Sequence, residues 1–170
     1  MPDIRLLQSP EAFPKYQIPI DWSLLADGTL DDTQALVTAV VVALGTDRLA
    51  SATDILPDPD STDRAGWWGD MDAEELFNGW PIGTKLWLLK RAKIVGAEDP
   101  EGATITRVEQ YISEALQPFV TNRICTSFDV EAWRVDTQQI DALVVIYRGP
   151  TRPVEMRFQV LWNEYDIERV

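Results

Sequence analysis

The sequence predicts an α+β fold in which helices precede an antiparallel sheet. Apolar residues recur with a helical period between positions 35 and 119, and they alternate with polar residues between 128 and 162. Helices and strands that are segregated along the chain are typical of this class. The 170 residues, of which 45% are hydrophobic, suit one domain, because a chain of this length buries roughly 70% of its unfolded-state surface.

The first predicted element is an N-terminal edge strand over residues 16–24. Pro19 within it cannot donate a ladder hydrogen bond, which places the strand at a sheet edge. The dipeptide Asp27-Gly28 then predicts a turn. The alternating apolar residues that predict the strand are Tyr16, Ile18, Ile20, Trp22 and Leu24.

The first of three main helices is predicted to end at Gly45, after an N-cap at Asp31 or Asp32. Residues 46–63 lack periodicity and are predicted to form an exposed loop. Their acids do not match a calcium loop, since the spacing from Asp58 leaves no glycine at the turn position. The inward helical face is formed by Val37, Val40, Val41 and Leu44.

Two further helices are predicted over residues 84–93 and from Thr106 to Pro118. The second helix starts with a capping box between Thr106 and Glu109, and Pro118 is expected to kink or end it. In the first, the cations at the end favour the helix dipole. The inward residues are Leu86 and Leu89 in one helix, and Ile105, Val108, Ile112, Ala115 and Phe119 in the other.

A three-stranded antiparallel meander is predicted to close the fold. Phe128, Val130 and Ala132 alternate with acids in its first strand, residues 142–147 are apolar on both faces, and apolar residues alternate from Val154 to Trp162. Residues 136–139 and 149–153 supply the turns.

The segment between Arg64 and Lys93 is the most informative part of the chain. It holds Trp67, Trp68, Trp80 and Trp87, four of the seven tryptophans. Adjacent indoles between Gly66 and Gly69 cannot both enter a small core from a regular helix or strand, so the segment turns sharply or offers an aromatic face to a partner. We weigh a local aromatic cluster and a protein interface equally, and sugar stacking is a further alternative.

The composition excludes several classes of function. No histidine is present and Cys125 is alone, which excludes histidine-based nucleophile pairs and zinc sites and any intrachain disulfide. The net charge of −13 disfavours nucleic acid as a partner, and no apolar run approaches the ~20 residues needed to cross a membrane. No signal peptide is recognised, which predicts synthesis and folding in the cytoplasm. We expect no cofactor and no metal.

Carboxylates remain the only plausible catalysts, and they define the alternative function. A tail-associated glycoside hydrolase would need two carboxyl groups at catalytic separation, for which the sequence offers no signature. The nominees are Glu74, Glu75, Glu109 and Glu114. Since nothing singles out a pair, we expect no enzymatic activity.

The ordered blocks resemble the small tail protein family of Mu-like phages over roughly residues 30–160. The blocks are a helix ending in Leu44-Gly45, the segments 63–70 and 83–91, the stretch 109–116 and the closing meander. The domain thus covers residues 30–170, and residues 1–29 form an extension. That family is similar in turn to the small baseplate wedge protein of T-even and P2-like phages and to TssE of type VI secretion.

The resemblance implies a structural part of a contractile-tail baseplate near the central spike. Such a part joins larger wedge subunits, initiates the sheath, occurs in six copies and resides in the virion tail. The broader group carries a glutamate-proline-arginine contact motif that is absent here, and Arg64 is a hypothetical substitute. Relatives are sometimes labelled tail lysozymes, without independent support from this sequence. The interface candidates are Arg64, Trp67, Trp68, Asp70, Trp87, Lys90 and Arg91.

Overall fold

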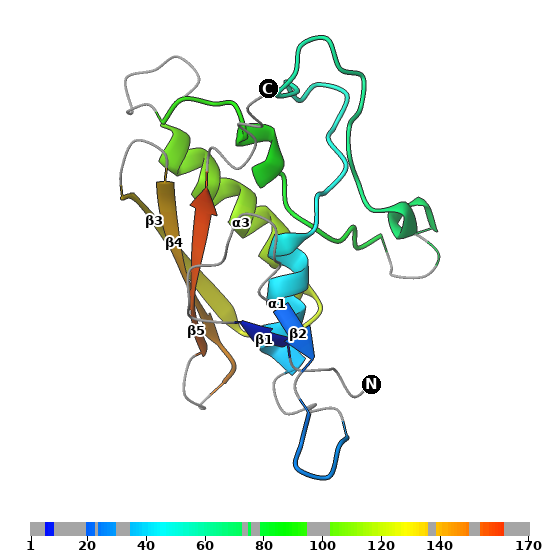
Figure 1. Ribbon diagram of the computed structural model, residues 1–170, viewed down its shortest axis with the longest axis vertical. Coiled ribbons are helices and arrows are strands. Elements are labelled where there is room, and N and C mark those ends of the chain that lie inside the picture. The colour runs from blue at the N-terminus through cyan, green and yellow to red at the C-terminus, as the bar shows by residue number, and fades with distance from the viewer. Residues whose placement is uncertain are drawn as a thin grey trace, which may run out of the picture. The chain divides into compact units, whose positions relative to one another are not determined.

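The structure is a computed structural model, and its helices and strands confirm the predicted α+β class (Figure 1). The chain divides into two compact units, Met1–Val42 and Ala43–Val170. The residues that the structure describes are 6–8, 20–22, 24–29, 35–72, 75, 79–94, 103–135, 139–149 and 154–161.

The first unit contains a two-stranded antiparallel sheet. Strand β1 (Leu6–Gln8) pairs with β2 (Ile20–Trp22), and Leu6 lies opposite Trp22. Of the strand predicted over 16–24, only Ile20–Trp22 is a described strand, and residues 9–19 lie outside the described part. The predicted turn follows, with the Asp27 carboxylate accepting the Thr29 backbone N–H at 3.0 Å.

Helix α1 (Ala35–Gly45) confirms the first predicted helix. Val40, Val41 and Leu44 are buried as expected, whereas Val37 is only partly buried and Leu36 takes a buried place. The proposed caps at residues 31 and 32 lie outside the described residues.

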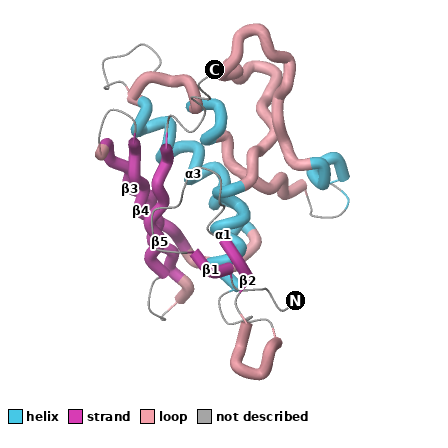
Figure 2. The backbone as a smooth tube through the Cα atoms, in the orientation of Figure 1, coloured by secondary structure: helices cyan, strands magenta, loops and turns pink. Residues whose placement is uncertain are grey.

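The second unit is built on α3 (Thr104–Thr121) and a sheet of three antiparallel strands. The strands are β3 (Ser127–Arg134), β4 (Gln139–Tyr147) and β5 (Val154–Leu161), paired in the order β3-β4-β5. Helix α3 packs against β3 and β4, and Figure 2 shows it running along the sheet. Period-two burial on β3 and β4 directs one face of each strand inward.

The core of this unit lies between α3 and the sheet. Ile112 and Leu116 on α3 and Ile140 and Ile146 on β4 are almost completely buried. Each such side chain contributes roughly 1.5–3 kcal/mol through its transfer from water. The helix is amphipathic at the predicted spacing, since Val108, Ala115 and Phe119 are buried as well.

The predicted start and end of α3 were wrong. The helix begins at Thr104 after Ala103, so Thr106 and Glu109 form no capping box. The Glu109 carboxylate instead accepts the backbone N–H of Ala132 on the outer strand β3, at 3.0 Å. Pro118 does not end the helix, which continues to Thr121 and closes with the Asn122 N–H bonded to the Pro118 carbonyl at 2.9 Å.

The helix predicted over 84–93 was also wrong. Only a 3₁₀ helix, η2 (Leu86–Leu89), forms, and the described residues therefore hold two α-helices rather than three. Three consecutive residues, Trp87, Leu88 and Leu89, are buried, so this segment is enclosed by its surroundings instead of exposing one helical face. Tertiary packing thus overrides helix propensity here.

The boundaries of two predicted turns differ as well. Gln139, predicted to belong to a turn, is the first residue of β4. Residues 136–138 and 150–153, and Trp162, lie outside the described part of the chain. Within that part, no helix has both the length and the apolar character required to cross a membrane.

Removing the Glu109 carboxylate tests its bond to β3. We expect Glu109→Ala to lower the free energy of unfolding by about 1–2 kcal/mol, because the Ala132 N–H loses its acceptor. Glu109→Gln keeps an acceptor oxygen and should lose less. Urea unfolding measures both, with exposed Glu131→Ala as the control. Equal losses for Ala and Gln would contradict this role.

Candidate functional site

Residues 46–85 leave α1 and return to η2 as an arm whose two ends are fastened together. Asp47 and Thr84 form a parallel bridge, in which the Arg48 N–H bonds to the Thr84 carbonyl at 3.0 Å and the Thr84 N–H to the Thr46 carbonyl at 2.9 Å. Gly83, at φ +110°, is required there, since a Cβ would lie 2.6 Å from the Thr46 carbonyl oxygen. The base of the arm is therefore closed by backbone bonds.

The buried Trp87 indole fixes this base to the rest of the unit. Its Nε1–H donates to the Arg48 carbonyl at 2.8 Å, and its ring belongs to a small core with Ala50 and Leu88. A tryptophan buried with its N–H satisfied contributes both area and direction. Trp87, predicted as an interface candidate, is thus a structural residue in this unit.

Arg64 braces the arm from inside. Its guanidinium donates to the Ala50 carbonyl, and the Ala50 N–H donates to the Arg64 carbonyl at 3.0 Å. Ala50 itself is completely buried, so the expectation that residues 46–63 form a merely exposed loop was wrong at this point. Arg64 therefore already has an internal partner.

A partly buried ion pair adds to the bracing. Lys85 Nζ lies 2.7 Å from Asp54 Oδ2, and both side chains are about one fifth exposed. Burial alone would raise the pKa of Asp54, but hydrogen bonds from Lys85 and Ser51 outweigh it and hold the pKa below its ordinary value. The charged form of Asp54 is therefore favoured in the folded arm.

Trp67 and Trp68 behave differently although they are adjacent. Their ring centroids lie 5.2 Å apart with the planes tilted by 48°. The Trp67 ring packs over Gly69, where a Cβ would lie 2.3 Å from ring atoms, so a glycine is required at this position. Trp67 is partly buried, whereas Trp68 is 77% exposed.

The short 3₁₀ helix η1 (Trp68–Asp72) forms an exposed apolar and acidic tip on the arm (Figure 1). Met71 is 83% exposed, and residues at i and i+3 share one side of a 3₁₀ helix, which places it beside Trp68. Asp72 is exposed next to them. We call Trp68, Met71 and Asp72 the arm tip.

Asp70 holds the tip to the returning chain. Its Oδ1 accepts the Ile82 N–H at 3.1 Å, and its backbone N–H donates to the Trp67 carbonyl at 3.0 Å. Its Oδ2 is buried and has no hydrogen-bond partner among the described residues. Asp70 is thus a positioning residue rather than a contact residue.

The cations predicted at a helix C-terminus lie instead along the arm. Lys90 is 3.7 Å from a carboxylate oxygen of Asp47, and Arg91 is 3.7 Å from one of Asp58. Both pairs are exposed, and such pairs contribute little to stability. These cations therefore remain available to a partner.

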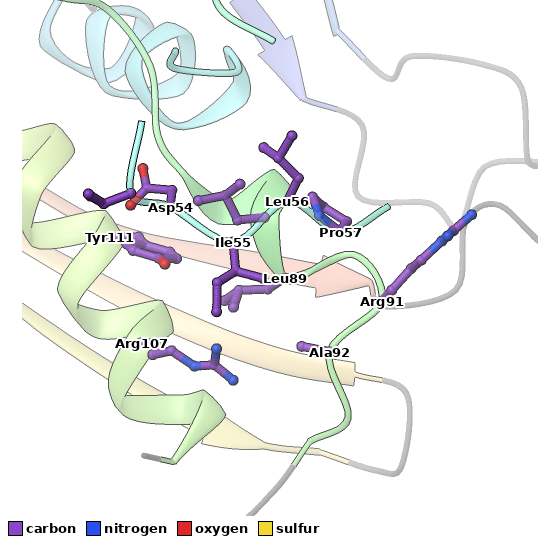
Figure 3. A pocket seen from close by; sticks show the side chains of 11 residues that line it. Asp54, Ile55, Leu56, Pro57, Leu89, Arg91, Ala92, Arg107 and Tyr111 are labelled. Carbon is purple, nitrogen blue, oxygen red and sulfur yellow. The ribbon is translucent and has the colours of Figure 1, made fainter. Parts of the chain in front are cut away.

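A pocket of about 390 Å³ lies between the arm, η2 and α3 (Figure 3). Tyr111 and Arg107 line it from α3, and Ile55, which is 78% exposed, lines it from the arm. Leu89 and Arg91 complete its apolar and basic character. Burial raises the pKa of Tyr111, which stays neutral at physiological pH. We call this the arginine pocket.

The pockets offer little to a carboxylate-pair hydrolase. Asp54, already bound to Lys85, is the one carboxylate lining the arginine pocket, and Glu114 is the one lining a second pocket of about 470 Å³ beside Trp80. Of the other nominees, Glu109 is bonded to β3 and Glu75 is exposed. Glu74 lies outside the described residues. Among the described residues, no group of three or more metal-ligating side chains is assembled.

The four tryptophans of this segment do not form one cluster. Trp67 contacts Trp68, Trp80 lies edge-on to Phe119 at 5.2 Å, and Trp87 packs separately at the arm base. The structure therefore favours an exposed aromatic tip over a shared packing hub. Sequence reasoning missed Met71 and Ile55; an isolated apolar residue among acids and prolines was the only signal.

Comparisons with known proteins identify relatives of the chain. The family model described as "Phage protein GP46" matches residues 36–152. "Baseplate protein gp46" of Escherichia phage Mu is 40% identical over 106 residues, which is 62% of this chain and 63% of that protein's length. "Mu-like prophage FluMu protein gp46" of Haemophilus influenzae is 29% identical over 136 residues, 79% of this chain and 82% of that protein. No solved structure matches.

Substituting Gly69 tests the packing that directs the tip. Gly69→Ala should displace the Trp67 ring, reduce the near-ultraviolet circular dichroism of the indole pair and cost about 1–3 kcal/mol. Gly45→Ala is the control, because nothing lies within 4 Å of its added Cβ. An unchanged spectrum for Gly69→Ala would contradict the packing described.

Acid should remove the contribution of the Asp54–Lys85 pair. Because the folded-state pKa of Asp54 lies below its ordinary 3.8, the contribution is present above that pH and is lost as the pH falls through the folded value. We expect Asp54→Asn to cost about 1–2 kcal/mol at pH 7 and much less below about pH 3. Thermal unfolding across pH measures this difference, which a constant gap would refute.

Proposed function

The chain belongs to the family of phage protein GP46, and from that premise we propose that it is a structural, non-enzymatic component of a Mu-like contractile-tail baseplate. Two observations support the proposal. One is the 40% identity to the Mu baseplate protein, and the other is the exposed arm tip on a braced arm. The proposed residence is therefore the virion tail, after synthesis in the host cytoplasm.

The arm tip is proposed to fasten this chain to a neighbouring baseplate subunit. An indole removes roughly 150–250 Å² from water when it is buried, which corresponds to about 4–6 kcal/mol before the costs of association. Tryptophan is accordingly enriched among residues that dominate binding energies. Because the arm is held closed at its base, little order has to be gained on binding.

The finer role is proposed from the resemblance of the sequence to baseplate wedge proteins. In it, the chain joins larger wedge subunits near the central spike, initiates the sheath and occurs in six copies. A sheath strand added to an open sheet edge would suit this role. The edge at β5 is the better candidate, since at the β3 edge the Ala132 N–H is already bonded to Glu109.

We do not propose the glycoside hydrolase. Such an enzyme needs two carboxyl groups about 5–9 Å apart across the scissile bond. Each pocket in the described part of the chain is lined by a single carboxylate, Asp54 or Glu114.

Truncating the tip tests the proposed function. In a phage or prophage that encodes this chain, Trp68→Ala with Met71→Ala should leave tails unassembled or without sheath, as seen by electron microscopy. The melting temperature of the purified variant should change little, because both side chains are largely exposed.

Val135→Ala is the matched control, since Val135 is also about half exposed but lies after β3 and away from the arm. Normal infectious tails from the double variant would refute the proposed role of the tip. Degradation of cell-wall polymer by the purified chain would refute the non-enzymatic proposal.

A further inference from the structure

The arm tip and the arginine pocket are complementary in chemistry. Resting on the proposed function, in which the tip binds a neighbour, we propose that this neighbour is a second copy of the same chain. The tip of one copy enters the arginine pocket of the next, with Trp68 and Met71 against its apolar wall and Asp72 beside its arginines.

The tip has the composition of a ligand for a basic apolar site. Trp68 and Met71 are 77% and 83% exposed and lie on one side of η1. The sequence from Asp70 to Glu75 adds four acids to this apolar pair. Asp70 is bonded to the returning chain, which leaves Asp72 and Glu75 exposed for a partner.

The arginine pocket has the opposite charge and a suitable volume. Its space of about 390 Å³ falls within the range of roughly 300–1,000 Å³ typical of ligand pockets. Ile55 and Leu89 supply apolar surface, while Arg91 and Arg107 supply positive charge at its edge. The acid that lines it, Asp54, is neutralised by Lys85 at 2.7 Å and does not repel an incoming carboxylate.

The local charges outweigh the repulsion between two acidic chains. Each copy carries a net charge of −13, but the Debye length is about 8 Å at physiological ionic strength, so charges beyond the contact are screened. Four bases fall between residues 85 and 93, and the exposed Arg91–Asp58 pair at 3.7 Å can exchange its carboxylate at small cost.

Tip and pocket occupy different parts of the surface, so the contact is heterologous. In Figure 1, η1 stands away from α3 and η2, between which the pocket opens. Each bound copy therefore keeps one unused tip or pocket, and copies add head to tail. Such contacts generate rings if the rotation closes and open chains if it does not.

Sedimentation velocity over a concentration series of the purified full chain tests the proposal. The wild type should associate as its concentration rises. Association should be lost in a tip variant, Trp68→Ala with Met71→Ala, and in a pocket variant, Ile55→Glu, which places a like charge before the acidic tip. Ile55 is exposed, so this change leaves the fold intact.

Mixing the two variants is the decisive arm of the experiment. The pocket variant retains an intact tip and the tip variant an intact pocket, so an equimolar mixture should give 1:1 dimers and nothing larger. Val135→Glu, which adds the same charge at an exposed site away from the pocket, should associate like the wild type.

A wild type that stays monomeric throughout the series, or a mixture that stays monomeric, would overturn the proposal. If the wild type is monomeric while Ile55→Glu still blocks tail assembly, an acidic segment of a different protein fills the pocket. That result would sink the self-contact and leave the proposed baseplate function standing. Normal tails from the tip variant would instead count against the proposed function itself.

Discussion

The closed base of the arm is the constraint on which the rest of the site depends. The Asp47–Thr84 bridge and the Trp87 Nε1–H bond to the Arg48 carbonyl join two segments that are almost forty residues apart in sequence. Closing a loop of that length costs conformational entropy, which these buried bonds and the Trp87 core offset. Without them, the arm would sample many conformations and bury its exposed indole elsewhere.

The second unit separates stability from recognition. The core between α3 and the sheet holds large apolar side chains such as Ile112 and Ile146 away from water. The arm carries the exposed apolar residues, the ion pairs and the arginine pocket. This division is expected of a part that must fold before it assembles, because an exposed indole costs the folded monomer little and contributes once a partner covers it.

Regular elements with a clear period could be predicted from the sequence. The face of α3 and the alternation on β3 follow from local spacing, since side-chain direction repeats with 3.6 or 2 residues. The arm could not be predicted, because its structure depends on contacts between distant residues. Arg64 and Trp87 have the residue types of interface anchors, but long-range bonds to Ala50 and Arg48 make them structural. Of the adjacent indoles, only Trp68 is left largely exposed, and Gly69 is the reason.

The account claims that the arm tip touches another polypeptide in the assembled tail. Replacing Met71 with photo-methionine and irradiating assembled tails tests this contact directly, because the diazirine inserts only into atoms beside it. The account predicts cross-links from position 71 to a neighbouring tail subunit, identified by mass spectrometry. Cross-links confined to the same chain, or to water alone, would contradict it.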